Sequence, residues 1–267
     1  SRKMARHGSE NSSSFDPVLC ELIDRWFCPP GGHVFDPFAG GCTSGIVARV
    51  LGYEFTGIEL REQQVQHNVA EAAKLGLTPR WIHGDSTKLG DVLPAGDRFD
   101  LLFTDPPYVG LEGYSGLDTD LSAQRDYARF LELLERFLVA AIERLRDDRF
   151  AVLKIGEVRA HDGSYFGFVP DCHAIMRRAG LRYVNEAILV TSAGSLPMRC
   201  RRAFEARRTL GKTHQNVLVF CKGDVRRAVE ACGTIEIDPT FPGGAMLEGE
   251  LVQEGGEADP DLEGEEV

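Results

Sequence analysis

The feature that most constrains the fold is an alternation of short apolar segments with segments of helical periodicity. Seven segments have the length and composition of buried strands, namely residues 34–36, 53–59, 80–83, 99–103, 150–156, 181–191 and 214–221. Helical patterns separate most of them, over residues 15–27, 46–51, 61–75, 124–146 and 169–179. This alternation predicts an α/β fold, with a doubly wound and mostly parallel seven-stranded sheet. Residues 192–213 show no clear helix, so we expect an antiparallel strand at the sheet edge.

The fourth strand-like segment ends in Thr104-Asp105-Pro106-Pro107-Tyr108. Two consecutive prolines continue neither a ladder nor a helix, so the strand must stop there. The stop places a carboxylate, a stiff run of carbonyls and an aromatic ring at the carboxyl end of a strand, where open α/β sheets bind ligands. Taken alone, so short a motif is also compatible with a proline-terminated strand and a surface tyrosine.

A second motif, upstream, favours the interpretation of this strand end as a ligand site. Asp36-Pro37-Phe38-Ala39-Gly40-Gly41 forms a small-residue turn after the first strand, and its glycines let the backbone approach a ligand closely. Gly57-Ile58-Glu59 then ends the second strand in a carboxylate. An acid about 20 residues beyond such a turn commonly binds ribose hydroxyls.

In this order and spacing, the motifs resemble those of S-adenosylmethionine-dependent DNA amino-methyltransferases of the Asp-Pro-Pro-Tyr type, which modify N6 of adenine or N4 of cytosine. The resemblance covers residues 14–223 and implies a Rossmann-like methyltransferase fold with S-adenosylmethionine as cofactor. It assigns to the cofactor Phe15, Pro17, Asp36, Pro37, Phe38, Gly40, Thr43, Glu59, Leu60, Asp85 and Ser86. Glu59 would hold the ribose hydroxyls and Asp85 the adenine amino group. Phe15 and Pro17 could equally serve core packing.

The same resemblance assigns catalysis to Asp105, Pro106, Pro107 and Tyr108. The Asp105 carboxylate and the Pro106 carbonyl would accept hydrogen bonds from an exocyclic amino group, and Tyr108 would stack on a base flipped out of a duplex. Neither a metal nor a covalent step is needed, and no Pro-Cys dipeptide supports attack on cytosine C5. An aspartate at the head of the motif favours adenine N6 in DNA. Cytosine N4 methylation, an RNA base methyltransferase and a catalytically idle cofactor-binding scaffold subunit are the alternatives.

The formal net charge of −11 is unevenly distributed. Residues 233–267 carry eleven acids and no lysine or arginine, which leaves 30 acids and 30 bases in residues 1–232. Their composition predicts a disordered acidic tail, either a solvated appendage or an arm that competes with DNA. We expect a single methyltransferase domain over residues 15–232, after a mobile N-terminal segment, residues 1–14.

Residues 192–213 carry a basic cluster against one acid, Glu205; its members are Arg199, Arg201, Arg202, Arg207, Arg208 and Lys212. We expect this cluster to bind DNA phosphates, which position a protein without reading sequence. A solvated charged loop is the alternative. Besides this segment, only the predicted flexible loop 109–123 is free for target recognition, and both are too short for a folded module. A homodimer or a separate specificity partner could therefore contribute.

The seven cysteines are scattered and form no Cys-x-x-Cys pair, so neither a zinc site nor a disulfide framework is indicated. No apolar run approaches the length of a membrane span, and no signal-peptide pattern opens the chain. These features predict a cytoplasmic protein in a reducing compartment.

Overall fold

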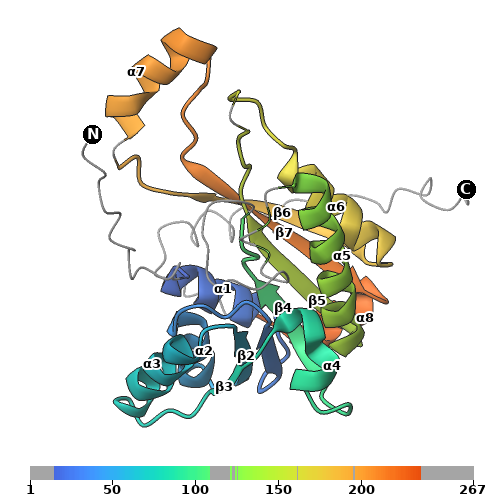
Figure 1. Cartoon of the computed structure of the whole chain (residues 1–267). Coiled ribbons are helices and arrows are strands. Elements are labelled where there is room, and N and C mark those ends of the chain that lie inside the picture. The colour runs from blue at the N-terminus through green and yellow to red at the C-terminus, as the bar shows by residue number, and fades with distance from the viewer. Residues whose placement is uncertain are drawn as a thin grey trace, which may run out of the picture. The chain divides into compact units, whose positions relative to one another are not determined.

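The computed structural model describes residues 15–108, 121, 124, 126–160, 162–194 and 196–235. In this part of the chain, seven strands form one sheet in the order β3-β2-β1-β4-β5-β7-β6 (Figure 1). The strands are β1 (His33–Asp36), β2 (Glu54–Glu59), β3 (Arg80–His83), β4 (Phe99–Thr104), β5 (Leu145–Ile155), β6 (Arg182–Val190) and β7 (His214–Lys222). All run parallel except β7, which confirms the predicted doubly wound, mostly parallel seven-stranded sheet.

The antiparallel strand lies one position further inside the sheet than predicted. β7 pairs antiparallel with both β5 and β6, so β6 forms the edge. The connection from β6 to β7 leaves and re-enters the sheet at adjacent positions. Val190 at the end of β6 pairs with His214 at the start of β7, and Thr191 N donates a hydrogen bond to Thr213 O at 2.8 Å. A strand that returns in this hairpin-like way runs opposite to β6, and it can fill the space between β6 and β5.

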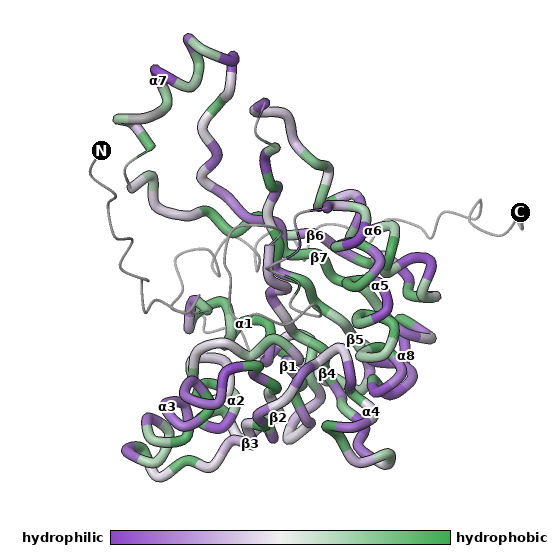
Figure 2. The backbone as a smooth tube through the Cα atoms, in the orientation of Figure 1, coloured by the Kyte–Doolittle hydropathy of each residue, from purple (hydrophilic) through white to green (hydrophobic). Residues whose placement is uncertain are grey.

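Helices cover both faces of the sheet (Figure 1). They are α1 (Pro17–Phe27), α2 (Thr43–Val50), α3 (Glu62–Ala73), the short 3-10 helix η1 (Ser86–Lys88), α4 (Leu89–Val92), α5 (Tyr127–Arg144), α6 (Phe168–Arg178), α7 (Leu196–Arg207) and α8 (Val225–Cys232). Residues of α1, α2, α3 and α8 join the apolar core that contains Phe103 and Val152, whereas α4, α5 and α6 pack on the core that contains Leu102 and Leu153. Successive strand residues thus alternate between the two cores, as the pleat requires, and hydrophobic colouring follows the central strands in Figure 2.

Local signals explain where the first predicted helix begins. The Asp16 carboxylate accepts hydrogen bonds from Val18 N and Leu19 N at 2.8 and 3.0 Å, and Pro17 occupies the first turn. The helix predicted over residues 124–146 is shorter at both ends. Asp126 caps its N-terminus, and the last two predicted residues already belong to β5.

The segment between β6 and β7 contains a helix, α7, where none was predicted. It lacks an apolar stripe, and Met198 is 81% exposed. Its residues are nevertheless good helix formers, and Arg201 pairs with Glu205 one turn later at 2.8 Å. Figure 1 shows α7 extending away from the sheet. We call residues 191–213 the α7 arm. The short elements η1 and α4 and the last helix, α8, were also not predicted.

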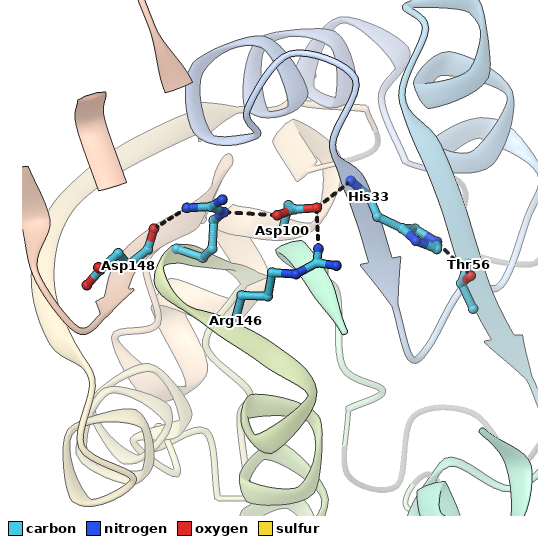
Figure 3. Close-up of polar contacts among 6 residues, drawn as sticks. His33, Thr56, Asp100, Arg146 and Asp148 are labelled. Atoms are coloured by element: carbon cyan, nitrogen blue, oxygen red, sulfur yellow. Dashed lines mark hydrogen bonds and ion pairs between the residues drawn. The ribbon is translucent and has the colours of Figure 1, made fainter. Parts of the chain in front are cut away.

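A charged network closes the amino-terminal edge of the sheet (Figure 3). The Asp100 carboxylate, near the start of β4, accepts hydrogen bonds from His33 N at 3.1 Å, Arg146 at 2.6 Å and Arg149 Nε at 3.0 Å. His33 begins β1 and the two arginines lie in the first half of β5, so one carboxylate ties three neighbouring strands together. Both carboxylate oxygens are used, and this edge offers no free acceptor on Asp100.

The described elements belong to one compact unit, Ser1–Gly233. The predicted N-terminal segment 1–14, the predicted loop 109–123 apart from Leu121, and the tail beyond residue 235 lie outside the described residues. No helix in the described ranges is long and apolar enough to cross a membrane. All seven cysteines are free thiols.

Candidate active site

Four acidic side chains lie at the carboxyl ends of four neighbouring parallel strands. Asp36 is the last residue of β1 and Glu59 of β2, while Asp85 follows β3 and Asp105 follows β4. Because β3, β2, β1 and β4 are neighbours in the sheet, these carboxylates share one edge. That edge, opposite the Asp100 network, is where open α/β sheets bind ligands.

Asp36 anchors the turn after β1 and is fully buried. Its Oδ1 accepts hydrogen bonds from Phe38 N at 3.1 Å and from Thr104 Oγ1 at 2.8 Å, which joins β1 to the end of β4. Its Oδ2 is buried and has no hydrogen-bond partner in the described part of the chain. Burial raises the pKa of Asp36 to about 7. A buried acceptor without a donor beside the strand ends is a position where a ligand group can complete a hydrogen bond.

The glycine turn is held in shape by side chains from two other segments. Asn68 Nδ2 of α3 donates to Gly40 O at 2.9 Å, and Gly40 has a φ of 53°, which favours glycine. Ser86 Oγ donates to Pro37 O, so the turn after β1 is tied to the end of β3. The turn therefore keeps one conformation and can present its backbone to a ligand.

Glu59 and Asp85 each accept two hydrogen bonds at one carboxylate oxygen from a residue two positions later in the chain. Glu59 is buried, and its Oε1 accepts from Arg61 N at 2.8 Å and from Arg61 Nε at 3.1 Å. Both bonds end on Oε1, so Oε2 is the oxygen that can take a hydroxyl. Asp85 caps η1, with Oδ1 accepting from Thr87 N at 2.9 Å and from Thr87 Oγ1 at 2.7 Å.

The other predicted cofactor residues take varied positions. Phe15 is buried and packs on Phe103 of β4, with ring centroids 4.7 Å apart. The Phe38 ring packs on Phe137 of α5 at 4.1 Å, so it also belongs to a core. Pro17 is exposed on the first turn of α1. Thr43 begins α2 next to the glycine turn, and Leu60 directly follows β2.

Asp105 is paired with a lysine that the sequence did not identify. Lys154 Nζ of β5 donates to Asp105 Oδ2, and both side chains are buried. Asp105 Oδ1 is buried too and has no partner within the described residues. Burial raises the pKa of Asp105 above its usual range, although the Lys154 ammonium opposes the shift. The sequence signal was a lysine inside the apolar run Phe150–Ile155.

Tyr108 borders a cavity that the sequence also did not reveal. The cavity has a volume of about 370 Å³, and the residues that line it are Tyr108, Gly156, Glu157, Thr191, Lys212, His214 and Gln215. They come from the Asp-Pro-Pro-Tyr motif, the end of β5 and both roots of the α7 arm. The Glu157 carboxylate accepts from Phe168 N and Val169 N at 3.1 Å, so it caps α6 while it lines the cavity.

The predicted basic cluster lies in the α7 arm, and one of its members, Lys212, also lines the cavity. Arg202 and Arg207 are exposed on α7, and Arg208 lies over the Phe204 ring, with its guanidinium carbon 5.1 Å from the ring centroid. Arg201 pairs with Glu205. Lys212 lines the cavity beside Tyr108. The side chain of Arg199 lies outside the described part of the structure.

Arg159 is a further base beside the arm that the sequence did not single out. One of its guanidinium nitrogens donates to Leu210 O at 3.4 Å, and its guanidinium carbon lies 3.9 Å from the centroid of the Tyr165 ring. Tyr165 is 46% exposed. A cation and an exposed aromatic ring therefore stand next to the carboxyl-terminal root of the arm.

Comparisons with known proteins agree with this architecture. No model of a known protein family matches the chain. The tRNA (guanine(10)-N2)-dimethyltransferase of Pyrococcus abyssi is 31% identical over 133 residues, which cover 47% of this chain and 36% of that protein. The chain therefore spans about a third of the length of this relative.

Solved structures with a similar fold include TrmN from Thermus thermophilus. It matches with a TM-score of 0.52 at 18% identity, over 78% of this chain and 49% of TrmN. A methyltransferase from Pyrococcus furiosus matches with a TM-score of 0.50 at 14% identity, over 80% of this chain and 87% of that one.

The residues at the carboxyl edge fit S-adenosylmethionine. An adenosyl group needs acceptors for its ribose hydroxyls and its amino group, and the methionine part carries an ammonium group. Glu59 Oε2 and the orphaned, buried Asp36 Oδ2 are carboxylate oxygens of the required kind, beside the glycine turn. The chain has the fold of S-adenosylmethionine-dependent methyltransferases, and S-adenosylmethionine is the cofactor that fits it.

Proposed function

We propose that this protein transfers a methyl group from S-adenosylmethionine to an exocyclic amino group of a nucleic-acid base. The observation that carries the proposal is Asp105 Oδ1, a buried acceptor without a partner in the described chain, directly after β4. The backbone carbonyl of the following residue, Pro106, is the second acceptor that we propose. Two acceptors of this kind suit a group with two N–H donors.

The chemistry needs these acceptors because the amino nitrogen is a poor nucleophile. Its lone pair is delocalised into the ring of the base. Hydrogen bonds from both amino protons to Asp105 Oδ1 and Pro106 O would draw the nitrogen toward tetrahedral geometry and free the lone pair. When bound, S-adenosylmethionine supplies an electrophilic methyl group. The residues of the chain would then act mainly by positioning, which can supply much of a rate enhancement.

Several of the other predicted residues would each hold part of one of the two substrates. Glu59 would bind the ribose hydroxyls, Asp85 and Ser86 the adenine end, and Asp36 with the glycine turn the methionine end of the cofactor. Tyr108 would stack on the target base. The cavity beside it is within the usual size of small-molecule sites, about 300–1,000 Å³.

Adenine N6 in DNA is the substrate that we propose first. The aspartate that opens the motif supports it by resemblance, and the arginines of the α7 arm offer phosphate contacts. A second candidate, a guanine amino group in RNA, is supported by the sequence relative that acts on tRNA. Both substrates present an exocyclic amino group, so the same acceptors would serve either.

Transfer of a tritiated methyl group tests the proposal. The purified protein is given unmethylated duplex DNA, single-stranded DNA and unmodified tRNA, and the products are digested to nucleosides for mass spectrometry. N6-methyladenine from DNA is the expected product, and it should disappear in Asp105→Ala but persist in the matched control Asp97→Ala. N2-methylguanine from tRNA alone would establish the second candidate instead. S-adenosylmethionine binding without transfer to any of the three would refute both.

A further inference from the structure

We infer that Lys154 is a positioning residue for the proposed transfer: it fixes one oxygen of the Asp105 carboxylate and so presents the other to the amino group of the base. The inference rests on the proposed function for its kinetic consequence. Its structural content, a carboxylate oriented by a buried lysine, can be tested without any methyl transfer.

The sheet register brings the two side chains together. Thr104 pairs with Leu153 in the parallel ladder between β4 and β5, so the next residues, Asp105 and Lys154, stand side by side. Lys154 Nζ donates to Asp105 Oδ2, and the two side chains are only 7% and 10% exposed. With Oδ2 taken, Oδ1 is left as the acceptor for an incoming donor.

Lys154 is itself held on a second side. Its ammonium lies 5.1 Å from the centroid of the Phe15 ring, and that ring packs on Phe103 of β4. An ammonium between a carboxylate and an aromatic face has few alternative positions, since it gains from both contacts. Phe15 directly precedes the Asp16 cap of α1, so the orientation of Asp105 is coupled to the start of α1.

A purely structural ion pair does not account for this arrangement. Pairing two buried charges stabilises a fold little, or not at all, compared with apolar residues of similar size. A structural pair would also satisfy both carboxylate oxygens, whereas Asp105 Oδ1 has no partner among the described residues. An orphaned, buried acceptor next to a fully engaged one points to a donor that arrives from outside.

The electrostatic surroundings of Asp105 give the inference a pH signature. The groups that act on its carboxylate are Lys154 from β5, Tyr108 from its own loop and Asp36 from β1. Burial raises the pKa of Asp105, and Lys154 and Tyr108 lower it. Without Lys154 the pKa of Asp105 rises further. The acidic limb of the rate profile, where Asp105 loses its proton, should therefore move to higher pH.

The first test follows Asp105 directly. Protein labelled with [¹³C]aspartate is titrated by NMR, and Asp105→Asn identifies the signal. In Lys154→Met the Asp105 carboxyl should titrate at higher pH than in the wild type, whereas Lys74→Met, which removes the exposed partner of Glu71, should leave it in place. An unchanged Asp105 titration in Lys154→Met overturns the inference, whatever the enzyme does.

The second test is kinetic. Lys154→Met should lower kcat by roughly 10²-fold near neutral pH, the scale of a misplaced reacting group, with part of the loss recovered at alkaline pH. Its affinity for S-adenosylmethionine by calorimetry should stay unchanged. Lys154→Arg keeps the positive charge, so the acidic limb of its rate profile should stay at the wild-type pH. If Lys154→Met does not fold, the neutral Lys154→Gln replaces it. If the neutral variant has the kcat of the wild type and the acidic limb of its rate profile lies at the same pH, the inference is overturned. If the wild-type protein itself is inactive, only the proposed function is refuted.

Discussion

Gln215 Nε2 donates a hydrogen bond to the Tyr108 hydroxyl at 3.2 Å, between residues 107 positions apart in the chain. The strands that these residues adjoin, β4 and β7, are not neighbours, since β5 lies between them. The bond therefore spans the carboxyl end of β5 and holds the Tyr108 ring over the cavity. The ring also packs edge-on against Phe168 of α6 at 5.7 Å, so its plane is fixed from two directions.

Removing this hydrogen bond should weaken catalysis modestly. A typical buried hydrogen bond contributes about 0.5–1.5 kcal/mol, so Tyr108→Phe and Gln215→Ala should each lower kcat/KM for the nucleic acid by roughly 2- to 12-fold. The double variant should lose no more than the single ones, because both remove the same bond. Tyr108→Ala should lose more, since base–aromatic stacking contributes about 1–3 kcal/mol. Steady-state kinetics of the four variants measures these differences, and additive losses in the double variant would contradict the coupling.

Glu59→Ala should weaken binding of S-adenosylmethionine. The loss leaves ribose hydroxyls without a charged acceptor, which costs about 1–3 kcal/mol, or roughly 5- to 150-fold in Kd. Isothermal calorimetry measures the change. Glu62→Ala, in the exposed first turn of α3, is the matched control and should bind as the wild type does. Equal affinity in Glu59→Ala and Glu62→Ala would remove Glu59 from the cofactor site.

Asp24 should make the protein less stable as the pH rises. This residue of α1 is 1% exposed, and its Oδ1 has no partner in the described chain. Burial, reinforced by Asp36, raises its pKa well above the usual 3.8. The folded state therefore holds the proton more tightly than the unfolded state. Stability falls by up to about 1.4 kcal/mol per pH unit from pH 4 upward, until the pKa of the folded state is passed.

Asp24→Asn removes this proton linkage. Its free energy of unfolding in urea should exceed that of the wild type at pH 8, and the gap should narrow toward pH 4. Glu21→Gln, on the exposed face of the same helix, should leave the pH dependence as it is. If Asp24→Asn follows the wild-type pH profile, another group causes the dependence.

The α7 arm should carry the salt-dependent part of nucleic-acid binding. Replacing Arg201, Arg202, Arg207 and Arg208 by Ala should lower affinity, and each lost phosphate contact should flatten the slope of log K against log salt by about 0.9 on duplex DNA. Fluorescence anisotropy at several salt concentrations measures the slope. A control replaces the exposed Arg25, Arg129, Arg226 and Arg227, which keeps the change in net charge equal. Equal slopes in the two quadruple variants would show that the arm is only a solvated helix.

The sequence predicted which acidic residues of the candidate site stand at strand ends. Asp36, Glu59, Asp85 and Asp105 each stand after an apolar run, and parallel strands bring such ends to one edge. The Lys154–Asp105 pair could not be predicted, because it depends on the register between β4 and β5. The cavity beside Tyr108 was missed because segments distant in sequence line it.

The helix α7 was missed for another reason. Helices are recognised by an apolar stripe, and α7 buries no such stripe. The antiparallel strand was placed at the edge because residues 192–213 show no clear helix, which suggests that the last two strands pair antiparallel but does not show which of the two lies outside. Pairing with β5 decides that, and it involves residues some 70 positions earlier, such as Phe150 against Cys221.

The α7 arm leaves and re-enters the sheet at two hydrogen-bonded residues, Thr191 and Thr213, so another segment could replace the arm between them. The residues between Thr191 and Lys212 can change in length and content while the two flanking strands keep their pairing and Lys212 keeps its place in the cavity wall. Under the proposed function, a different arm on the same sheet would meet a different target while the carboxylates after β1, β2 and β4 stay where they are. Evolution, or a designer, could then retarget such a scaffold by grafting one segment.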